Sequence, residues 1–165
     1  MMDTLTTDHA LYATPLKDDV RAHLKTLCER HSAQSFLEIG TGFGETSAWL
    51  ALKRPTMKID TVEKNADAAQ KAFQLFASLG LSSHIHVYHE NAHRFYPVKT
   101  YDGILLDASK SQQKALVERF FPVLNPMGFM LIDNIHLSRI KNAPHSASRE
   151  SLEAKHDAFM TWLLA

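Results

Sequence analysis

The sequence predicts an α/β fold with a doubly wound, mainly parallel sheet of about five strands. Short apolar runs typical of buried strands alternate with amphipathic stretches long enough to be helices, which is the pattern of βαβ units. The chain has 165 residues, 45% of them hydrophobic and 22% charged, which is the size and composition of one globular domain. We therefore expect a single domain, residues 1–165, with helices on both faces of the sheet.

The first predicted helix spans residues 15–31. Thr14 is placed to cap it, and Pro15 suits its first position because proline needs no amide donor there. Apolar residues recur at helical spacing and form one stripe: Val20, Leu24, Leu27 and Cys28. Since Cys28 lies on this stripe, we expect it to pack in the core rather than act as a nucleophile.

Residues 35–39 form a short apolar run that ends in glycines, which indicates a buried strand. A helix is expected at 45–53, where Pro55 follows just beyond its end. The next apolar run, 58–63, predicts a second strand.

A strong helical pattern covers residues 66–79 and ends at Gly80, a favourable stop for a helix. Its inward face is expected to comprise Ala69, Ala72, Phe73, Phe76 and Ala77. Residues 85–88 then predict a third strand.

The second half of the chain continues the alternation. A fourth strand is expected at 101–107 and a helix at 111–121. A turn at 125–128 leads into a fifth strand at 129–133. The final helix is expected at 146–164, with one apolar face.

In such a sheet, ligands bind beyond the carboxyl ends of the strands, where the strand order reverses. Five segments of the sequence are expected at these ends: Gly40–Gly44, Glu63, Glu90–Ala92, Asp107–Lys110 and Asp133–Asn134.

The glycine-rich turn points to a nucleoside ligand, because glycines let backbone amides approach a ligand closely. Glu63, at the end of the next strand, can accept hydrogen bonds from both ribose hydroxyls. The glycines of the turn are spaced Gly-x-Gly-x-Gly and preceded by Glu38, whereas dinucleotide-binding turns are spaced Gly-x-Gly-x-x-Gly.

A second group of polar residues follows the fourth and fifth strands, whose ends are expected to be neighbours. Asp107, Asp133 and Asn134 would bring three oxygen ligands together beside the nucleoside pocket. Hard oxygen ligands suit Mg²⁺ or another divalent cation such as Mn²⁺ or Ca²⁺.

Four runs, in this order, make the chain similar to the cation-dependent O-methyltransferases of class I, which include catechol and caffeoyl-coenzyme A O-methyltransferases and bacterial relatives. They are Phe36–Gly44, Thr61–Glu63, Tyr101–Lys110 and Leu131–Asn134. The resemblance implies a Rossmann-like class I methyltransferase fold. Members of that family usually continue into two more strands, so we expect the last two family strands to be missing here and the fifth strand to lie at an edge.

The resemblance also implies residue roles, with S-adenosylmethionine as the cofactor. Its binding residues would be Glu38, Gly40, Gly42, Phe43, Thr46, Glu63, Asn91, Ala92 and Asp107. Glu63 would hold the ribose, the glycines and Thr46 would border the methionine, and Asn91 and Ala92 would lie near the adenine.

For the reaction itself, the resemblance implies Lys110 as the general base and a metal site at Asp107, Asp133 and Asn134. The expected reaction is methyl transfer to a hydroxyl oxygen of a small catechol-like or hydroxylated aromatic acceptor. The alternatives are a hydroxyuridine methyltransferase acting on tRNA, a non-catalytic nucleoside-binding module and, more distantly, a nicotinamide-dependent oxidoreductase.

Charge and composition bear on partners and location. Eighteen basic and eighteen acidic residues balance, so no excess of positive charge favours a nucleic-acid partner over a small molecule. A single cysteine and the lack of any apolar run near the roughly 20 residues of a membrane span indicate a cytoplasmic protein. An uncovered fifth strand and an apolar face on the last helix predict a homodimer.

Overall fold

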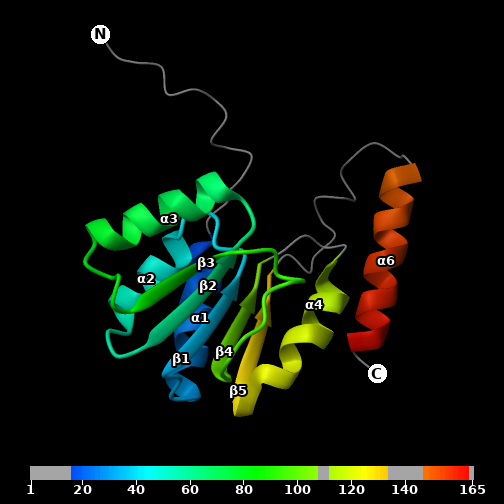
Figure 1. Cartoon of the computed structure of the whole chain (residues 1–165). Coiled ribbons are helices and arrows are strands. Elements are labelled where there is room, and N and C mark those ends of the chain that lie inside the picture. Colours follow the sequence, from blue (N-terminus) through cyan, green and yellow to red (C-terminus); the bar gives the residue numbers. More distant parts are fainter. Residues whose placement is uncertain (1–15, 108–111, 134–146, 164–165) are drawn as a thin grey trace.

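The computed structural model describes residues 16–107, 112–133 and 147–163. Within them, five strands form one parallel sheet in the order β3-β2-β1-β4-β5 (Figure 1). The strands are β1 (Ser35–Ile39), β2 (Lys58–Glu63), β3 (Ile85–His89), β4 (Tyr101–Leu106) and β5 (Leu124–Ile132). The strand order reverses between β1 and β4, so a ligand site is expected above these two strands.

Helices cover both faces of the sheet, with α1, α2 and α3 on one side and α4 and α6 on the other (Figure 1). They are α1 (Asp18–Arg30), α2 (Glu45–Lys53), α3 (Ala66–Ser78), α4 (Gln113–Phe120) and α6 (Ala147–Leu163), with a short 3₁₀ helix η3 (Phe121–Val123) after α4. This arrangement confirms the predicted α/β, Rossmann-like, doubly wound fold.

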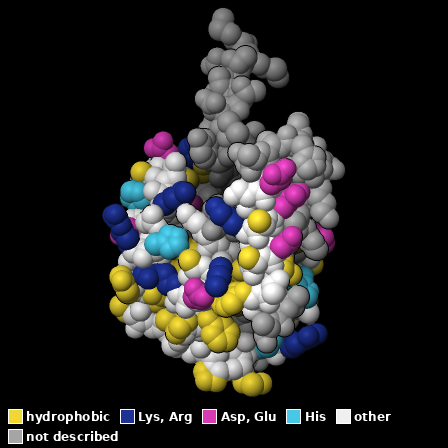
Figure 2. Space-filling view, turned by 90° about the vertical axis from the view of Figure 1, so that its right-hand side faces the viewer, with side chains coloured by type: hydrophobic (Ala, Val, Ile, Leu, Met, Phe, Trp, Pro, Cys, Tyr) yellow, Lys and Arg dark blue, Asp and Glu magenta, His cyan; other side chains and the backbone are white. Residues whose placement is uncertain are grey.

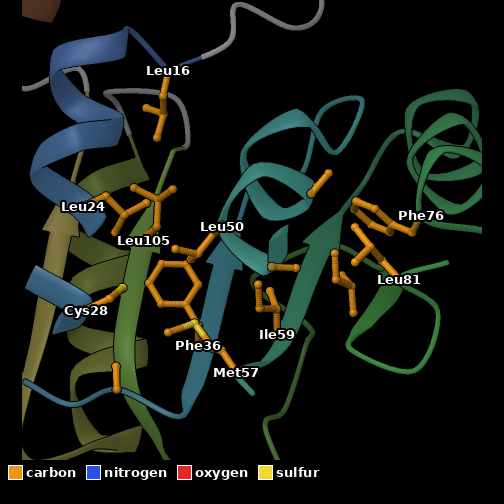
Figure 3. Close-up of a cluster of buried hydrophobic side chains, with 14 of the residues drawn as sticks. Leu16, Leu24, Cys28, Phe36, Leu50, Met57, Ile59, Phe76, Leu81 and Leu105 are labelled. Carbon is orange, nitrogen blue, oxygen red and sulfur yellow. The ribbon is translucent and has the colours of Figure 1, made fainter. Parts of the chain in front are cut away.

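The core on the α1–α3 side is centred on Phe36 of β1, which lies between α1 and α2 together with Leu50 and Leu105 (Figure 3). Cys28 is fully buried in the same cluster, and burial raises the pKa of its thiol to about 11. The prediction that this cysteine packs in the core is therefore confirmed.

The opposite side of the sheet buries the alternate residues of the same strands. Leu37 and Ile104 pack there against Leu116 and Phe120 of α4, and Phe159 of α6 joins them. Because β1 and β4 are covered on both faces, nearly every residue in them is buried, and most are apolar.

Helix α1 begins three residues later than predicted, at Asp18 rather than Pro15. Leu16 and Lys17 are not helical, and Lys17 has the extended backbone of an N-cap. Leu16 is buried, and in Figure 3 it lies on the same side of the sheet as Leu24 and Leu105. Leu16 thus contributes to the core from the segment just before the helix.

The inward face of α3 also differs from the prediction. Phe73 is 57% exposed and Ala77 is exposed, whereas Ala68 is buried with Ala69, Ala72 and Phe76. A helix turns by about 100° per residue, so a stripe through 68/69, 72 and 76 leaves position 73 on the solvent side.

The predicted turn at 125–128 lies inside β5, which starts at Leu124. The register of the pairing between β4 and β5 shifts between Tyr101 and Gly103. The extra residues belong to β5 and form an irregularity of the β-bulge kind. Met127 has a φ of +68°, and its carbonyl oxygen lies 2.6 Å from His31 Nδ1. In the described part of the chain β5 is an edge strand, as expected; its pairing with a second copy stays a prediction.

Figure 2 shows the face seen from the right of Figure 1. Positive and negative side chains are interspersed there, and hydrophobic side chains gather toward the lower end. None of the helices in the described residues is long and apolar enough to cross a membrane.

One buried polar contact connects β4 to β2 across the sheet. The Tyr101 hydroxyl donates to Asp60 Oδ2 at 2.7 Å, and Lys99 Nζ lies 2.9 Å from the same oxygen. Burial, followed by the hydrogen bond to Asp60, raises the pKa of Tyr101. The phenol therefore stays protonated and acts as a donor to the carboxylate at neutral pH.

We predict that Tyr101→Phe lowers the free energy of unfolding by about 1–3 kcal/mol, because a buried carboxylate loses one hydrogen bond. Urea unfolding measures the change. Tyr96→Phe is the matched control, since Tyr96 is 77% exposed and its variant should unfold like the parent protein. Equal stability of Tyr101→Phe and the parent would show that the contact contributes nothing.

Candidate active site

The turn after β1 passes unusually close to the end of β4. Gly40 has a φ of +98°, and a Cβ atom at this position would lie 2.0 Å from the carbonyl oxygen of Asp107. Any side chain would displace one of the two segments, so only glycine fits. The close approach places the glycine loop beside Asp107, as predicted from the strand order.

The amides of the loop are held by β2. Gly40 N–H and Thr41 N–H both donate to the carbonyl oxygen of Val62, at 3.0 and 3.3 Å. The loop ends at Gly44, which caps α2 with a φ of +86°. A Cβ atom on Gly44 would lie 2.6 Å from the Phe76 ring, so α3 packs directly against the loop.

Glu63 connects the loop to the end of β2. Its Oε2 accepts a hydrogen bond from Gly42 N–H at 2.9 Å, and its Oε1 accepts one from Asn65 N–H at 2.8 Å. A carboxylate has about four acceptor positions, so each oxygen retains capacity for one more donor. Glu63 is thus oriented by two amides and can still accept both hydroxyls of a ribose.

A buried polar network lies beneath the loop. Glu38 Oε2 accepts hydrogen bonds from Ser47 Oγ at 2.5 Å and Thr61 Oγ1 at 2.9 Å. The Thr61 hydroxyl also lies 2.5 Å from that of Thr41. All four residues are buried, so the network joins β1, β2, the loop and α2 away from water.

Burial raises the pKa of Glu38 to about 8, although the hydrogen bonds from Ser47 and Thr61 lower it, and the nearby charges of Asp107 and Glu63 raise it further. Glu38 was predicted as a cofactor-binding residue. In the structure its Oε2 accepts from two protein hydroxyls, through which it positions the loop, and contact with a cofactor stays a prediction.

The ends of β2 and β3 border an open hollow of about 500 Å³. Its lining residues come from the two strand ends: Lys64, Asn65, His89, Glu90 and Asn91. Glu90 N–H donates to the Glu63 carbonyl oxygen at 3.0 Å, which joins the two ends. Asn91 thus lines this hollow, while Ala92 is half-buried and packs against the second core, and the position of the adenine stays a prediction.

The two carboxylates predicted to bind metal lie at the ends of adjacent strands. Asp107 N–H donates to the Ile39 carbonyl oxygen at 2.9 Å, and Asp133 N–H donates to the Leu106 carbonyl oxygen at 3.0 Å. Both residues are half-buried. The described residues contain no group of three histidine, cysteine or acidic side chains that could hold a metal.

The structure places the remaining predicted residues as follows. Thr46 is buried in the first turn of α2, and Phe43 is half-buried with Lys71 Nζ 4.8 Å from the centre of its ring. Lys110 and Asn134 lie outside the described residues.

Sequence reasoning missed Ser47, Thr61 and Asn65. Asn65 both donates to Glu63 and caps α3, where its side chain accepts from Ala68 N–H at 2.9 Å. The available signal for the other two was a hydroxyl in the middle of an otherwise apolar strand or helix, because a buried hydroxyl needs a partner.

We predict that Glu38→Gln changes how stability depends on pH. As pH rises from about 5 to about 8, the unfolded protein loses the Glu38 proton while the folded protein keeps it, so the parent loses stability over this window. The variant has no such proton. Its stability relative to the parent should therefore increase across the window, by up to a few kcal/mol.

Urea unfolding at about pH 5 and about pH 8 provides the comparison. Glu29→Gln, at an exposed position on α1, is the control and should follow the parent at both values. A constant difference between Glu38→Gln and the parent would contradict the raised pKa.

Comparisons with known proteins agree with this geometry. A family model described as "Methyltransferase domain" matches residues 37–135, which is more than half of the chain. A structure of a proposed caffeoyl-CoA O-methyltransferase from Staphylococcus aureus has a TM-score of 0.82 at 24% identity, covering 92% of this chain and 75% of that one.

Two further solved structures are similar. A proposed O-methyltransferase from Klebsiella pneumoniae has a TM-score of 0.78 at 20% identity, with 95% of this chain and 73% of that chain covered. An O-methyltransferase from Bacillus cereus, in complex with SAH, has a TM-score of 0.71 at 21% identity, with 90% and 72% covered. These structures share the class I methyltransferase fold. Because the matched segment contains the glycine loop, Glu63 and the ends of β4 and β5, this chain belongs to the methyltransferase-domain family.

Proposed function

We propose that the chain transfers a methyl group from S-adenosylmethionine to a hydroxyl oxygen of a small, catechol-like or hydroxylated aromatic acceptor. The observation that carries the proposal is the pairing of Glu63 with the Gly40–Gly44 loop at the reversal of strand order. Support comes from the similar folds of O-methyltransferases, one of them in complex with SAH.

The cofactor would lie across the carboxyl ends of β1, β2 and β3. Glu63 would accept hydrogen bonds from the ribose hydroxyls, since two amides already orient its carboxylate. The hollow that Asn91 lines would take the adenine. Gly40, Gly42, Phe43 and Thr46 would border the methionine end, because they form the loop and the start of α2.

Asp107 and Asp133 fit a divalent cation such as Mg²⁺. They are hard oxygen donors, half-buried at the ends of neighbouring strands, and Asn134 follows Asp133 directly. When bound, such a cation would lower the pKa of a hydroxyl group on the acceptor. The site would then place the acceptor oxygen beside the methyl donor.

The chain's own part in the reaction is positioning and proton removal. Lys110 would take the proton from the acceptor hydroxyl as the oxygen forms a bond to the methyl carbon. The bond between that carbon and sulfur breaks, which leaves S-adenosylhomocysteine. Holding both reactants in line would supply much of the rate enhancement.

We predict that S-adenosylhomocysteine binds and that NAD does not, because the glycine spacing differs from that of dinucleotide sites. Glu63→Ala should weaken S-adenosylhomocysteine binding at least roughly tenfold, since hydrogen bonds to a charged acceptor contribute about 1.5–3 kcal/mol. Calorimetry measures both.

Glu29→Ala, which removes an exposed carboxylate of α1, is the control and should bind like the parent. Undiminished binding by Glu63→Ala would contradict the assignment of Glu63 as the residue that binds the ribose hydroxyls. Binding of NAD in preference to S-adenosylhomocysteine would favour the oxidoreductase instead.

We predict that excess chelator abolishes methyl transfer while S-adenosylhomocysteine binding largely survives. Asp133→Asn should weaken the affinity for Mg²⁺, and Lys110→Ala should lower turnover about 10²–10⁴-fold with little effect on cofactor binding. The assay is tritiated methyl transfer to a catechol panel and to unmodified and hydroxylated tRNA.

Each alternative corresponds to a different result of that assay. Activity that persists in excess chelator would contradict the metal mechanism. Transfer to tRNA alone would identify the hydroxyuridine methyltransferase. Cofactor binding without transfer to any acceptor would favour the non-catalytic binding module.

A further inference from the structure

Large hydrophobic side chains gather at the end of the sheet opposite the proposed cofactor site. Among the described residues, the four most exposed of them are Val98 (94%), Met127 (88%), Tyr96 (77%) and Phe121 (63%), which we call the amino-end patch. They lie in the segments that lead into β4 and β5 and in the first part of β5 itself. This is the lower end of the molecule in Figure 1, and Figure 2 shows hydrophobic side chains gathered there. Exposed apolar side chains that gather at one place mark a surface that binds a partner.

Strand pairing and one ring contact bring members of the patch together. The first residues of β4 and β5 pair with each other, and Val98 and Phe121 each stand three positions before them. Arg119 links Tyr96 to the same place, because its guanidinium group lies 4.5 Å from the centre of the Tyr96 ring, two residues before Phe121. Tyr96, Val98 and Phe121 therefore share the surface that precedes β4 and β5.

The irregularity in β5 extends the patch toward α1. Met127 has a φ of +68°, in the left-handed region that few residues other than glycine adopt. Its carbonyl oxygen lies 2.6 Å from Nδ1 of His31 at the end of α1, while its side chain stays 88% exposed. An apolar side chain is thus held away from the core at a strained position, which favours a role outside the fold.

Basic side chains lie at the same end of the sheet. They are Arg30 at the end of α1, Lys58 at the start of β2, Lys99 just before β4 and Arg119 near the end of α4. The first three are exposed, and Arg119 is half-buried against Tyr96. The apolar patch therefore has cations beside it.

The acidic side chains described at this end are already compensated. Glu29 and Glu118 each lie close to a lysine one helical turn away, at 2.6 and 3.8 Å. Asp60 is buried beside Lys99, and the Asp102 carboxylate accepts hydrogen bonds from two backbone amides, a serine hydroxyl and an asparagine amide. The charge that remains available to a ligand at this end is therefore mainly positive.

An anionic lipid surface has the chemistry that fits both features. Apolar side chains of peripheral proteins enter the boundary between the lipid headgroups and the acyl chains, while lysine and arginine contact the anionic headgroups. A protein partner fits less well, because lysine is depleted at protein interfaces and their apolar centres are closely packed. The amino-end patch instead consists of single side chains from separate segments.

We propose that the amino-end patch binds an anionic lipid surface, with its four side chains in the headgroup boundary and the neighbouring arginines and lysines against the lipid phosphates. Such binding is peripheral and needs no helix that crosses the membrane. The carboxyl ends of the strands lie at the opposite end of the sheet, so the Gly40–Gly44 loop and Glu63 would face water. The inference is therefore independent of the proposed function.

Co-sedimentation of the protein with lipid vesicles tests the proposal. Vesicles of phosphatidylcholine alone are compared with vesicles of phosphatidylcholine and phosphatidylserine, at low and high salt. The variants are Phe121→Ser, Val98→Ser and Arg30→Gln. Phe73→Ser is the control for the apolar side chains, since Phe73 is 57% exposed on α3 and lies outside the patch. Lys17→Gln, at the other end of α1 from Arg30, is the control for charge.

The parent should bind the vesicles that contain phosphatidylserine, bind phosphatidylcholine only weakly, and be released as salt rises, because exposed charges are then screened. Phe121→Ser should weaken binding roughly tenfold, since an aromatic side chain no longer leaves water, and Val98→Ser somewhat less. Arg30→Gln should weaken binding roughly fivefold, the effect of one basic residue near an anionic surface. Phe73→Ser and Lys17→Gln should bind like the parent.

Failure of the parent to bind vesicles that contain phosphatidylserine would overturn the inference. Binding by Phe121→Ser and Val98→Ser equal to that of the parent would also overturn it, and Val98→Ser should fold normally because its side chain packs against almost nothing. Light scattering without lipid tests a second copy as the occupant. A dimer that Phe121→Ser dissociates and Phe73→Ser does not would assign the patch to that copy instead. A parent that binds vesicles but not S-adenosylhomocysteine would leave this inference standing and overturn the proposed function.

Discussion

The contact between the turn after β1 and the end of β4 is the constraint on which the candidate site depends. A Cβ atom at Gly40 would come within 2.0 Å of the Asp107 carbonyl oxygen, so the two segments meet backbone to backbone. Asp107 N–H donates to the carbonyl of Ile39 in the same region. Because β1 and β4 are paired in register up to this point, the pairing of the sheet sets how closely the loop approaches Asp107.

The buried network under the loop also fixes the position of the loop, at some cost in the free energy of unfolding. Glu38 is removed from water, and its pKa is raised to about 8. Burying a carboxyl group costs free energy that an apolar residue at this position would not cost. In exchange, its hydrogen bonds with Ser47 and Thr61 join α2 and β2 to β1 through side chains. The loop amides then need little rearrangement when a ligand binds, which favours affinity.

Much of the fold could be predicted because its local signals agree with the tertiary structure. The bounds of β1, α2 and β2 match the predicted ranges, since glycines and prolines mark their ends and both faces of the strands are buried. Position 73 could not be placed, because an alanine-rich helix offers more than one apolar stripe and packing against the loop selects the one through Phe76. The start of β5 was missed because Asn125, Pro126 and Gly128 favour a turn by themselves, whereas pairing with β4 draws them into the sheet.

The same reasoning explains which parts of the site the sequence could reveal. Glu63 and the glycine loop were recognisable because their roles depend on backbone geometry and on chain neighbours at the ends of strands. Ser47 and Thr61 are harder to recognise, since only the packing of α2 and β2 against β1 brings their hydroxyls to Glu38. A rigid sheet edge can hold a cofactor in this way, whereas the acceptor is selected by the segments that follow the strands. Asp107 and Asp133 stand at the ends of β4 and β5, so under the proposed function the acceptor would be selected next to these two strand ends.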